Sequence, residues 1–183
     1  MSITQDVKKV LISTEELEKR IYQLGKQIEK DYAGKEPVII GILKGSVAFM
    51  ADLLKTIDLP LVTDFMAVSS YGNGTVSSGH VKIIKDLSID IADKDVLIIE
   101  DILDSGNTLS HLCKMLSSRG ARSIKICALL NKPERRTADI ELDYEGFVIP
   151  DEFVVGFGLD YNEKYRNLPF VGVLKEEVYR NKE

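Results

Sequence analysis

The sequence predicts an α/β domain built on a central, mostly parallel sheet flanked by helices, and two features predict it. Two apolar runs, Pro37–Leu43 and Val96–Ile99, lack the alternation of half-exposed strands, which is typical of strands buried on both faces, and Ser123–Leu130 is predicted as a further strand. Segments with helical periodicity separate these runs, as the long crossover connections between parallel strands require.

The first elements are a helix and a strand–helix unit. Ser13 and Glu16 form a capping-box pattern, and an apolar stripe with helical spacing follows: Leu17, Ile21, Leu24, Ile28 and Tyr32. After the strand Pro37–Leu43, the residues Lys44–Ser46 form a tight turn and residues 47–54 begin a second helix.

The middle of the chain adds further strands and one more helix. A strand from Leu61 to Ser69 is followed by a polar loop at residues 70–80 and a short strand at residues 81–84. After the Val96 run, helical spacing recurs at Leu109, Leu112, Cys113 and Leu116. The C-terminal third is less regular and contains three short apolar runs, at residues 147–149, 154–157 and 170–174.

Composition limits the class of protein. The 183 residues are 44% hydrophobic and 29% charged, which suits a single domain over residues 1–183. A net charge of −5 argues against general affinity for nucleic acid. No apolar stretch could span a bilayer and the start of the chain is polar, so we expect a cytoplasmic protein without a membrane partner. Cys113 and Cys127 fall inside predicted elements and are interpreted as core residues rather than a disulfide.

The Val96 run ends abruptly in three acids: Glu100, Asp101 and Asp104. The carboxyl ends of strands in an open α/β sheet border the ligand crevice. Carboxylates gathered there repel one another unless they are paired or bind a cation. Their position therefore indicates a divalent metal site or a proton-transfer role.

The residues after these acids, Ser105–Thr108, form a small turn at the start of the next helix. Gly106 lets the backbone approach a ligand closely, and the amides and hydroxyls of such a turn suit an anion. Ser, Asn and Thr are also common helix caps, so the turn alone is equally consistent with a purely stabilising role.

The segment Ile98–Leu109 resembles the phosphoribosyl pyrophosphate (PRPP) loop of the type I phosphoribosyltransferases. The resemblance implies that family's fold, with a small hood built mainly from residues 145–183 and part of the N-terminal segment. It implies that Glu100 and Asp101 hold the ribose hydroxyls and Mg²⁺, and that Asp104 faces the base as the catalytic group. It assigns the ribose 5-phosphate to four residues: Ser105, Gly106, Asn107 and Thr108.

Two other loops fit the same resemblance. Lys44 and Gly45 follow the first long strand, where the family binds pyrophosphate and where the peptide bond ahead of the lysine can be cis. Taken alone, Lys44 is more readily interpreted as a solvated lysine before a glycine turn. Ser70 and Tyr71 begin the polar loop and match the Ser-Tyr pair with which the 6-oxopurine members close over PRPP, although the sequence alone indicates a surface loop.

Lys132 follows the strand Ser123–Leu130 at the same rim. An ammonium group donates to a 6-oxo group and cannot accept from a 6-amino group, so a lysine at the base would select 6-oxopurines over adenine. A capping or salt-bridging role is the alternative.

The segment Pro150–Pro169 resembles the hood of the 6-oxopurine transferases. The resemblance implies that Phe153 stacks on the purine and that Val154 contacts the base edge through its backbone. It places Asp160 by the base and a second Mg²⁺ site, and Arg166 at the pyrophosphate. These residue types suit a flat base, a metal and a diphosphate. For Phe153, a core aromatic is the alternative.

The resemblance implies a Mg²⁺-dependent enzyme of purine salvage. It would join hypoxanthine or guanine to PRPP, giving IMP or GMP and pyrophosphate, and would act as a homodimer or homotetramer. Two alternatives stay open: a transferase for another base, and a regulatory protein of the same fold that binds RNA. The acidic composition disfavours the second, because RNA binding requires a basic face.

Overall fold

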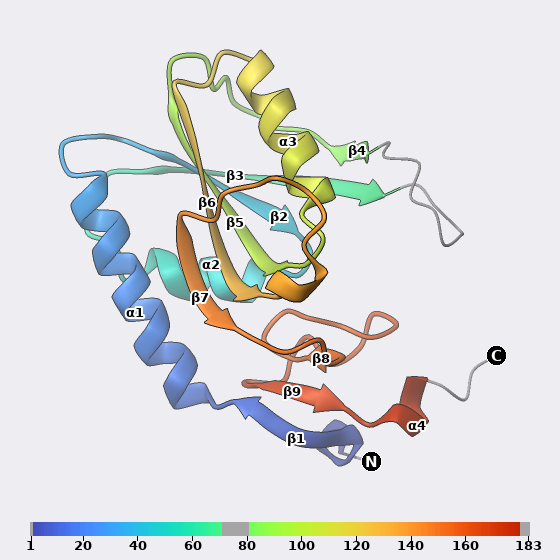
Figure 1. The fold of residues 1–183 in the computed structure, drawn as a ribbon. Coiled ribbons are helices and arrows are strands. Elements are labelled where there is room, and N and C mark those ends of the chain that lie inside the picture. The colour runs from blue at the N-terminus through green and yellow to red at the C-terminus, as the bar shows by residue number, and fades with distance from the viewer. Residues whose placement is uncertain (1, 71–80, 180–183) are drawn as a thin grey trace.

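The computed structural model describes residues 2–70 and 81–179, and its central sheet confirms the predicted fold class. Six strands lie in the order β4-β3-β2-β5-β6-β7 (Figure 1). Their bounds are β2 Val38–Leu43, β3 Val62–Ser70, β4 Val81–Lys85, β5 Asp95–Leu103, β6 Ser123–Asn131 and β7 Tyr144–Val148. All neighbouring pairs are parallel except β3 with β4, which is antiparallel.

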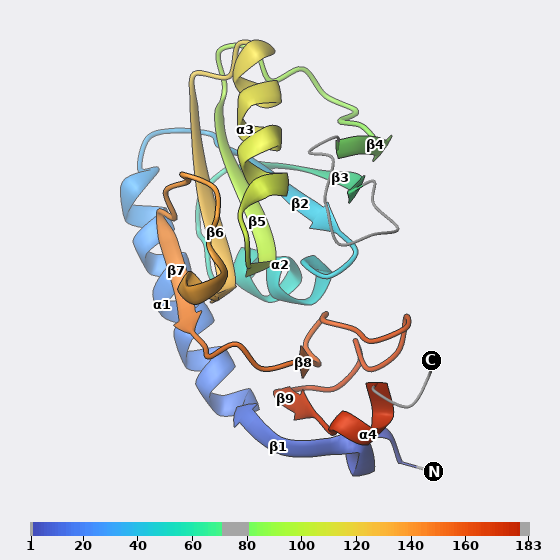
Figure 2. The same cartoon turned by 45° about the vertical axis from the view of Figure 1, so that its right-hand side comes forward.

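Helices cover both faces of this sheet. α1 (Thr14–Asp31) and α2 (Val47–Leu54) pack on one face, and α3 (Asn107–Ser118) packs on the other (Figure 2). The strand residues divide accordingly: Ile39 and Leu97 lie in the core under α1 and α2, whereas Ile40 and Ile98 lie in the core under α3. This double burial is the reason for the unbroken apolar runs. None of the helices in the described ranges is long and apolar enough to cross a membrane.

A second, smaller sheet lies beyond the carboxyl edge of the first (Figure 1). It contains β1 (Val7–Ile12), β9 (Val171–Leu174) and β8 (Val154–Val155) in that order, all antiparallel. Short helices flank it: η1 (Ile3–Asp6) and α4 (Glu176–Tyr179). We call these elements, together with the connecting residues 156–170, the hood.

The predicted elements are present with small shifts. The capping box of Ser13 and Glu16 starts α1, as predicted. β5 continues through the first two acids to Leu103, so Glu100 and Asp101 lie inside the strand rather than after it. The third C-terminal strand is β9, but the expected strand at residues 154–157 reduces to two residues, and β1 was not expected as a strand from its residues. Cys113 and Cys127 are free thiols.

Candidate active site

The carboxyl ends of β2, β5 and β6 lie side by side at the sheet edge that faces the hood (Figure 2). Because parallel strands all end at the same edge, residues far apart in sequence gather there. Five of the predicted site residues come from these three strand ends: Lys44, Glu100, Asp101, Asp104 and Lys132.

Glu100 and Asp101 form an acid pair in the last part of β5. Burial raises the pKa of Glu100 well above its ordinary value, and the neighbouring charge of Asp101 raises it further. Burial also raises the pKa of Asp101. Oε2 of Glu100 is buried and has no hydrogen-bond partner among the described residues. A divalent cation would relieve both the repulsion and the unsatisfied oxygen, so this pair fits Mg²⁺.

The acid pair is not a complete metal cage. Among the described residues, no three His, Cys, Asp or Glu side chains are grouped so that they could hold a metal ion. Mg²⁺ ordinarily takes one or two protein carboxylates and fills its shell with waters and substrate oxygens. The donor set therefore suits an ion whose coordination is completed by a phosphorylated ligand.

The turn Ser105–Thr108 leads from β5 into α3. Gly106 has φ 82°, in the left-handed region, and a Cβ there would lie 2.9 Å from Cγ2 of Ile140, so only glycine fits. The N-cap residue Gly106 offers no side-chain cap, but the Asn107 amide donates a long hydrogen bond of 3.5 Å to Oγ of Ser105. Within the described residues the helix-capping alternative is thus present only as this one long bond, and the neighbouring amides at the helix start are available to an anion.

A cavity of about 230 Å³ joins Glu100 of the acid pair to this turn. Its polar lining comes from Glu100, Asp104, Ser105, Gly106 and Thr108. One small polar ligand could therefore contact a carboxylate, the candidate catalytic acid and the helix start at the same time.

Asp104 directly follows β5 and is held by two arginines. Its Oδ1 lies 3.0 Å from Nε of Arg135, which makes an ion pair, and within the part of the chain that the structure describes that oxygen has no hydrogen-bond partner. Nε of Arg136 donates to the backbone oxygen of Asp104 at 2.9 Å. Arg135 thus pairs with the Asp104 side chain, and Arg136 separately holds the Asp104 backbone.

Lys132 lies at the end of β6 and is only 6% exposed. Its Nζ donates to the backbone oxygen of Glu152 at 2.7 Å and lies 3.5 Å from Oδ1 of Asp151. The salt-bridging alternative is thus present in the structure. An ammonium group has three hydrogens, however, so a fixed Lys132 retains a donor for a ligand.

The loop after β2 packs between the acid pair and the hood. The Leu43–Lys44 peptide bond is cis. A Cβ on Gly45 would collide with Oδ2 of Asp101, and a Cβ on Gly158 would collide with the backbone oxygen of Gly45. The backbone at Gly45 therefore lies directly against a carboxylate of the site.

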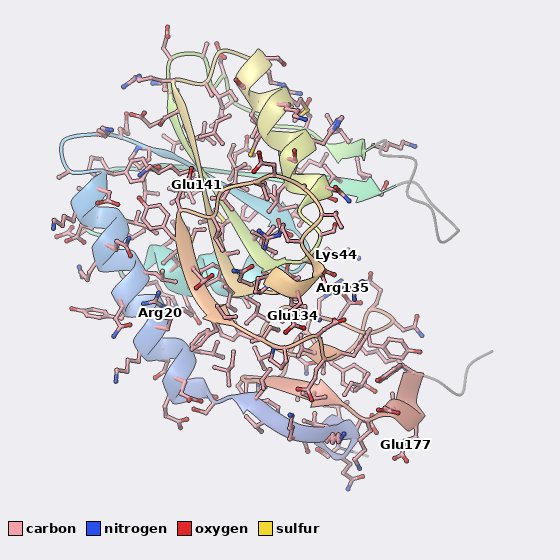
Figure 3. All side chains as sticks on the ribbon, viewed as in Figure 1. Arg20, Lys44, Glu134, Arg135, Glu141 and Glu177 are labelled. Atoms are coloured by element: carbon pink, nitrogen blue, oxygen red, sulfur yellow. The ribbon has the colours of Figure 1, made fainter. Side chains whose placement is uncertain are left out.

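The two predicted pyrophosphate-binding cations meet at one hood carboxylate. Nζ of Lys44 lies 2.9 Å from Oε2 of Glu163, and Nη2 of Arg166 lies 3.5 Å from the same oxygen. Nη2 of Arg166 also lies 2.8 Å from Oδ1 of Asp160, while its Nε is buried without a partner. Asp160, predicted at the metal and the base, is thus paired with Arg166. In Figure 3 the labelled Lys44 lies between the sheet edge and the hood.

Phe153 precedes β8 and is 40% exposed, so the core alternative is not observed. Its ring stacks on Tyr179 with centroids 4.9 Å apart and meets Tyr161 edge-on at 5.7 Å. Val154 is buried in β8 and pairs with Val173. Of the two residues predicted to close over PRPP, Ser70 is the last residue of β3 and Tyr71 lies outside the described residues.

Sequence reasoning missed several residues of the site: Arg135, Arg136, Asp151, Glu163 and Tyr179. Arg135 and Arg136 follow Lys132 by three and four positions at the same strand end. This nearness to Lys132 is the sequence feature that could have marked the two arginines as site residues. Asp151 and Glu163 lie within the segment that resembles the hood, but nothing in their residue types marked them as partners of cations.

Unsatisfied polar atoms concentrate at this site. Five buried side-chain polar atoms of the described residues have no hydrogen-bond partner, and one of them is the hydroxyl of Tyr32. The other four belong to the sheet edge, to the hood and to the segment between β7 and β8: Glu100 Oε2, Asp104 Oδ1, Arg166 Nε and Glu152 Oε2. Buried groups left without partners are rare and costly, so their clustering marks a place built for a ligand.

Comparison with known proteins gives a consistent result. The family model described as "Phosphoribosyl transferase domain" matches residues 11–162. The hypoxanthine-guanine phosphoribosyltransferase of Bacillus subtilis is 57% identical over 176 residues, which cover 96% of this chain and 98% of that protein.

Two further similarities extend over almost the whole chain. A crystal structure of a hypoxanthine phosphoribosyltransferase from Staphylococcus aureus superposes with a TM-score of 0.94 and 56% identity, covering 97% of this chain and 96% of the other. The bifunctional protein TilS/HprT of Listeria monocytogenes is 56% identical over 178 residues, which are 97% of this chain. The present chain spans only 28% of the length of that protein.

Proposed function

The chain belongs to the phosphoribosyltransferase family, within its hypoxanthine-guanine branch, and from this premise we propose that it transfers the phosphoribosyl group of PRPP to hypoxanthine or guanine. The products are IMP or GMP and pyrophosphate, so the reaction is one of purine salvage. The observation that carries the proposal is the cavity that joins Glu100, Asp104 and the Ser105–Thr108 turn.

The sheet edge supplies the groups that bind PRPP. The turn Ser105–Thr108 binds the 5-phosphate through its amides and hydroxyls, and the long Asn107-to-Ser105 bond of 3.5 Å gives way to the phosphate. Lys44, the amide of Gly45 and Arg166 bind the pyrophosphate. Ser70 and Tyr71 close over it and exclude water from the electron-poor ribosyl centre.

Glu100 and Asp101 hold the ribose hydroxyls and, with Asp160, would hold Mg²⁺ directly or through water. The unsatisfied Oε2 of Glu100 and the raised pKa of both paired acids support this assignment. When bound, the ion neutralises the charge that develops on the pyrophosphate leaving group.

The purine lies between Phe153 and the sheet edge. Lys132 donates to the 6-oxo group, the backbone of Val154 and the carboxylate of Asp160 contact the base edge, and Phe153 stacks on the ring. Asp104 accepts or shares the N7 proton as N9 attacks the ribosyl carbon. Buried Lys132 supports the choice of a 6-oxopurine, because an ammonium offers no acceptor to a 6-amino group.

We further expect the protein to act in the cytoplasm, because PRPP and its nucleotide products are highly charged and do not cross membranes unaided. We also expect a homodimer or homotetramer. Light scattering on the purified protein measures the second expectation, and a monomer at working concentration would contradict it.

An absorbance assay tests the function directly. The protein is mixed with Mg²⁺, PRPP and each of hypoxanthine, guanine, xanthine and adenine in turn. We expect turnover with hypoxanthine or guanine and none with adenine. RNA binding in the absence of any PRPP-dependent turnover would overturn the proposal in favour of a regulatory protein.

A further inference from the structure

The two carboxylate oxygens of Asp104 lie in different surroundings. Oδ1 is buried, has no hydrogen-bond partner, and lies 3.0 Å from Nε of Arg135. The Asp104 side chain as a whole is nevertheless 39% exposed. Because Oδ1 contributes almost nothing to that exposure, the accessible oxygen is Oδ2. One oxygen is thus engaged by the protein and the other is open to a ligand.

Arg135 is itself anchored at its far end. Its Nη1 lies 3.4 Å from Oδ1 of Asp151, and Nζ of Lys132 lies 3.5 Å from the same oxygen. Asp151 therefore contacts both Lys132, which is proposed to bind the 6-oxo group, and Arg135, which contacts the proposed proton acceptor Asp104. The guanidinium thus bridges the carboxylates of Asp104 and Asp151.

The backbone that carries Arg135 is also held in place. The residue ends a short 3-10 helix, Pro133–Arg135, that begins with proline. The next residue, Arg136, donates from Nε to the backbone oxygen of Asp104 at 2.9 Å and from Nη2 to Oδ1 of Asn131 at 2.5 Å. Arg135 therefore presents its side chain from a segment tied to both neighbouring strand ends. Figure 3 shows Arg135 in the space between the sheet edge and the hood.

We propose that Arg135 is a positioning residue for Asp104: its guanidinium holds Oδ1 so that Oδ2 faces the N7 position of the purine. The terminal torsion of an aspartate is broad, so an unheld carboxylate samples many orientations. Proton transfer requires the accepting oxygen within hydrogen-bond reach of the proton. A planar guanidinium, paired with carboxylates at both ends, restricts that torsion in a way that a flexible ammonium cannot.

A simple surface ion pair is the competing interpretation, because Arg135 is half exposed and such pairs add little to stability. The two interpretations predict different coupling. A surface pair contributes to stability whatever Asp104 does in the reaction. A positioning residue affects turnover only through Asp104.

The inference rests on the proposed function. A double-mutant cycle distinguishes the positioning role of Arg135 from a simple surface ion pair. In the wild-type background, Arg135→Gln lowers kcat by about tenfold, a part of the roughly 10²- to 10⁴-fold that a positioned base contributes. The KM for PRPP stays unchanged. In the Asp104→Asn background the same change lowers kcat by less than about twofold, because the effects of coupled residues do not add. Arg135→Lys recovers part of the loss.

Two controls accompany the cycle. Arg119→Gln makes the same chemical change in an ion pair with Asp86, and Glu134→Gln changes the exposed neighbour of Arg135, which makes no hydrogen bond or ion pair within the described residues. Both should keep wild-type kcat, and melting temperatures exclude misfolding.

An equal loss from Arg135→Gln in both backgrounds, or kcat within twofold of wild type, overturns the inference while the proposed function stands. A wild-type protein without PRPP-dependent turnover overturns the proposed function and the inference with it.

Discussion

Oε2 of Glu163 lies 2.9 Å from Nζ of Lys44 and thus pairs with one of the two cations assigned to pyrophosphate. The same oxygen lies 3.5 Å from Nη2 of Arg166, the other cation. The carboxylate and Lys44 are largely exposed, so water screens their attraction and the pair is weak. A diphosphate bearing several negative charges can therefore displace Glu163 from between the two cations.

Replacing Glu163 should ease that displacement. We expect Glu163→Gln to lower the KM for PRPP by about two- to fivefold, which corresponds to the free energy of an exposed pair. Initial-rate kinetics measure the change. Glu177→Gln, the same substitution at an exposed site on α4, should leave the KM as it is. A KM that rises in Glu163→Gln would mean that Glu163 helps to bind PRPP rather than competing with it.

Gly45 should tolerate no side chain. Its missing Cβ leaves the space occupied by Oδ2 of Asp101, so Gly45→Ala must displace either the loop or the acid pair. We expect the KM for PRPP to rise at least about tenfold, in line with the cost of misplacing a binding group by roughly an ångström. Gly34→Ala is the control, since its Cβ meets nothing within 4 Å and only its backbone conformation is strained. Unchanged kinetics in Gly45→Ala would contradict the close packing of this loop.

Lys132 should carry the choice of base. Lys132→Gln removes the ammonium and offers an amide that can both donate and accept. We expect kcat/KM for hypoxanthine to fall by about 10- to 100-fold, the equivalent of one charged hydrogen bond, and the hypoxanthine-to-adenine ratio to fall with it. Measuring kcat/KM for both bases tests this. If the hypoxanthine-to-adenine ratio of kcat/KM stays at the wild-type value, Lys132 does not recognise the substituent at C6 of the purine.

Much of the fold and part of the site could be predicted from local sequence. The capping box at Ser13 predicted the start of α1 because both of its bonds are local. The unbroken Val96 run predicted a central strand, because burial on both faces removes the polar alternation. The resemblance of Ile98–Leu109 to the type I phosphoribosyltransferases and of Pro150–Pro169 to their 6-oxopurine branch is confirmed by relatives that match along nearly the whole chain.

What could not be predicted depends on contacts between distant residues. β1 pairs with β9, more than 150 residues away, and its exposed lysines hide any strand alternation. The ion pairs of Arg135 with Asp104 and of Lys44 with Glu163 likewise join separate loops. No local pattern encodes such pairs, because each arises only after the sheet edge and the hood come together.

The hood should respond to high pH through Tyr165. Its hydroxyl donates to Oδ2 of Asp6 at 2.7 Å, and this bond raises the pKa of Tyr165 to about 12 from an ordinary value of 10.0. A raised pKa means that the stabilisation is complete below about pH 10 and is lost as the pH rises towards about 12.

We therefore expect Tyr165→Phe to lower the free energy of unfolding by about 1 kcal/mol at pH 7. The gap from wild type should narrow near pH 11, as measured by urea denaturation at both pH values. Tyr22→Phe, at an exposed tyrosine on α1, should show no pH-dependent gap. If the difference in free energy of unfolding between wild type and Tyr165→Phe stays constant from pH 7 to 11, the hydrogen bond to Asp6 does not raise the pKa of Tyr165.

We predict above all that the three acids have separate roles: Glu100 and Asp101, in β5, bind PRPP and its metal, whereas Asp104, directly after β5, exchanges a proton with the base. Comparing kcat with the KM for PRPP in Asp104→Asn tests it most directly, with Glu100→Gln as the matched acid-to-amide change. We predict that Asp104→Asn lowers kcat by about 10²-fold or more and leaves the KM for PRPP within about twofold, whereas Glu100→Gln raises that KM. Equal losses of turnover and of PRPP affinity in Asp104→Asn would contradict the account.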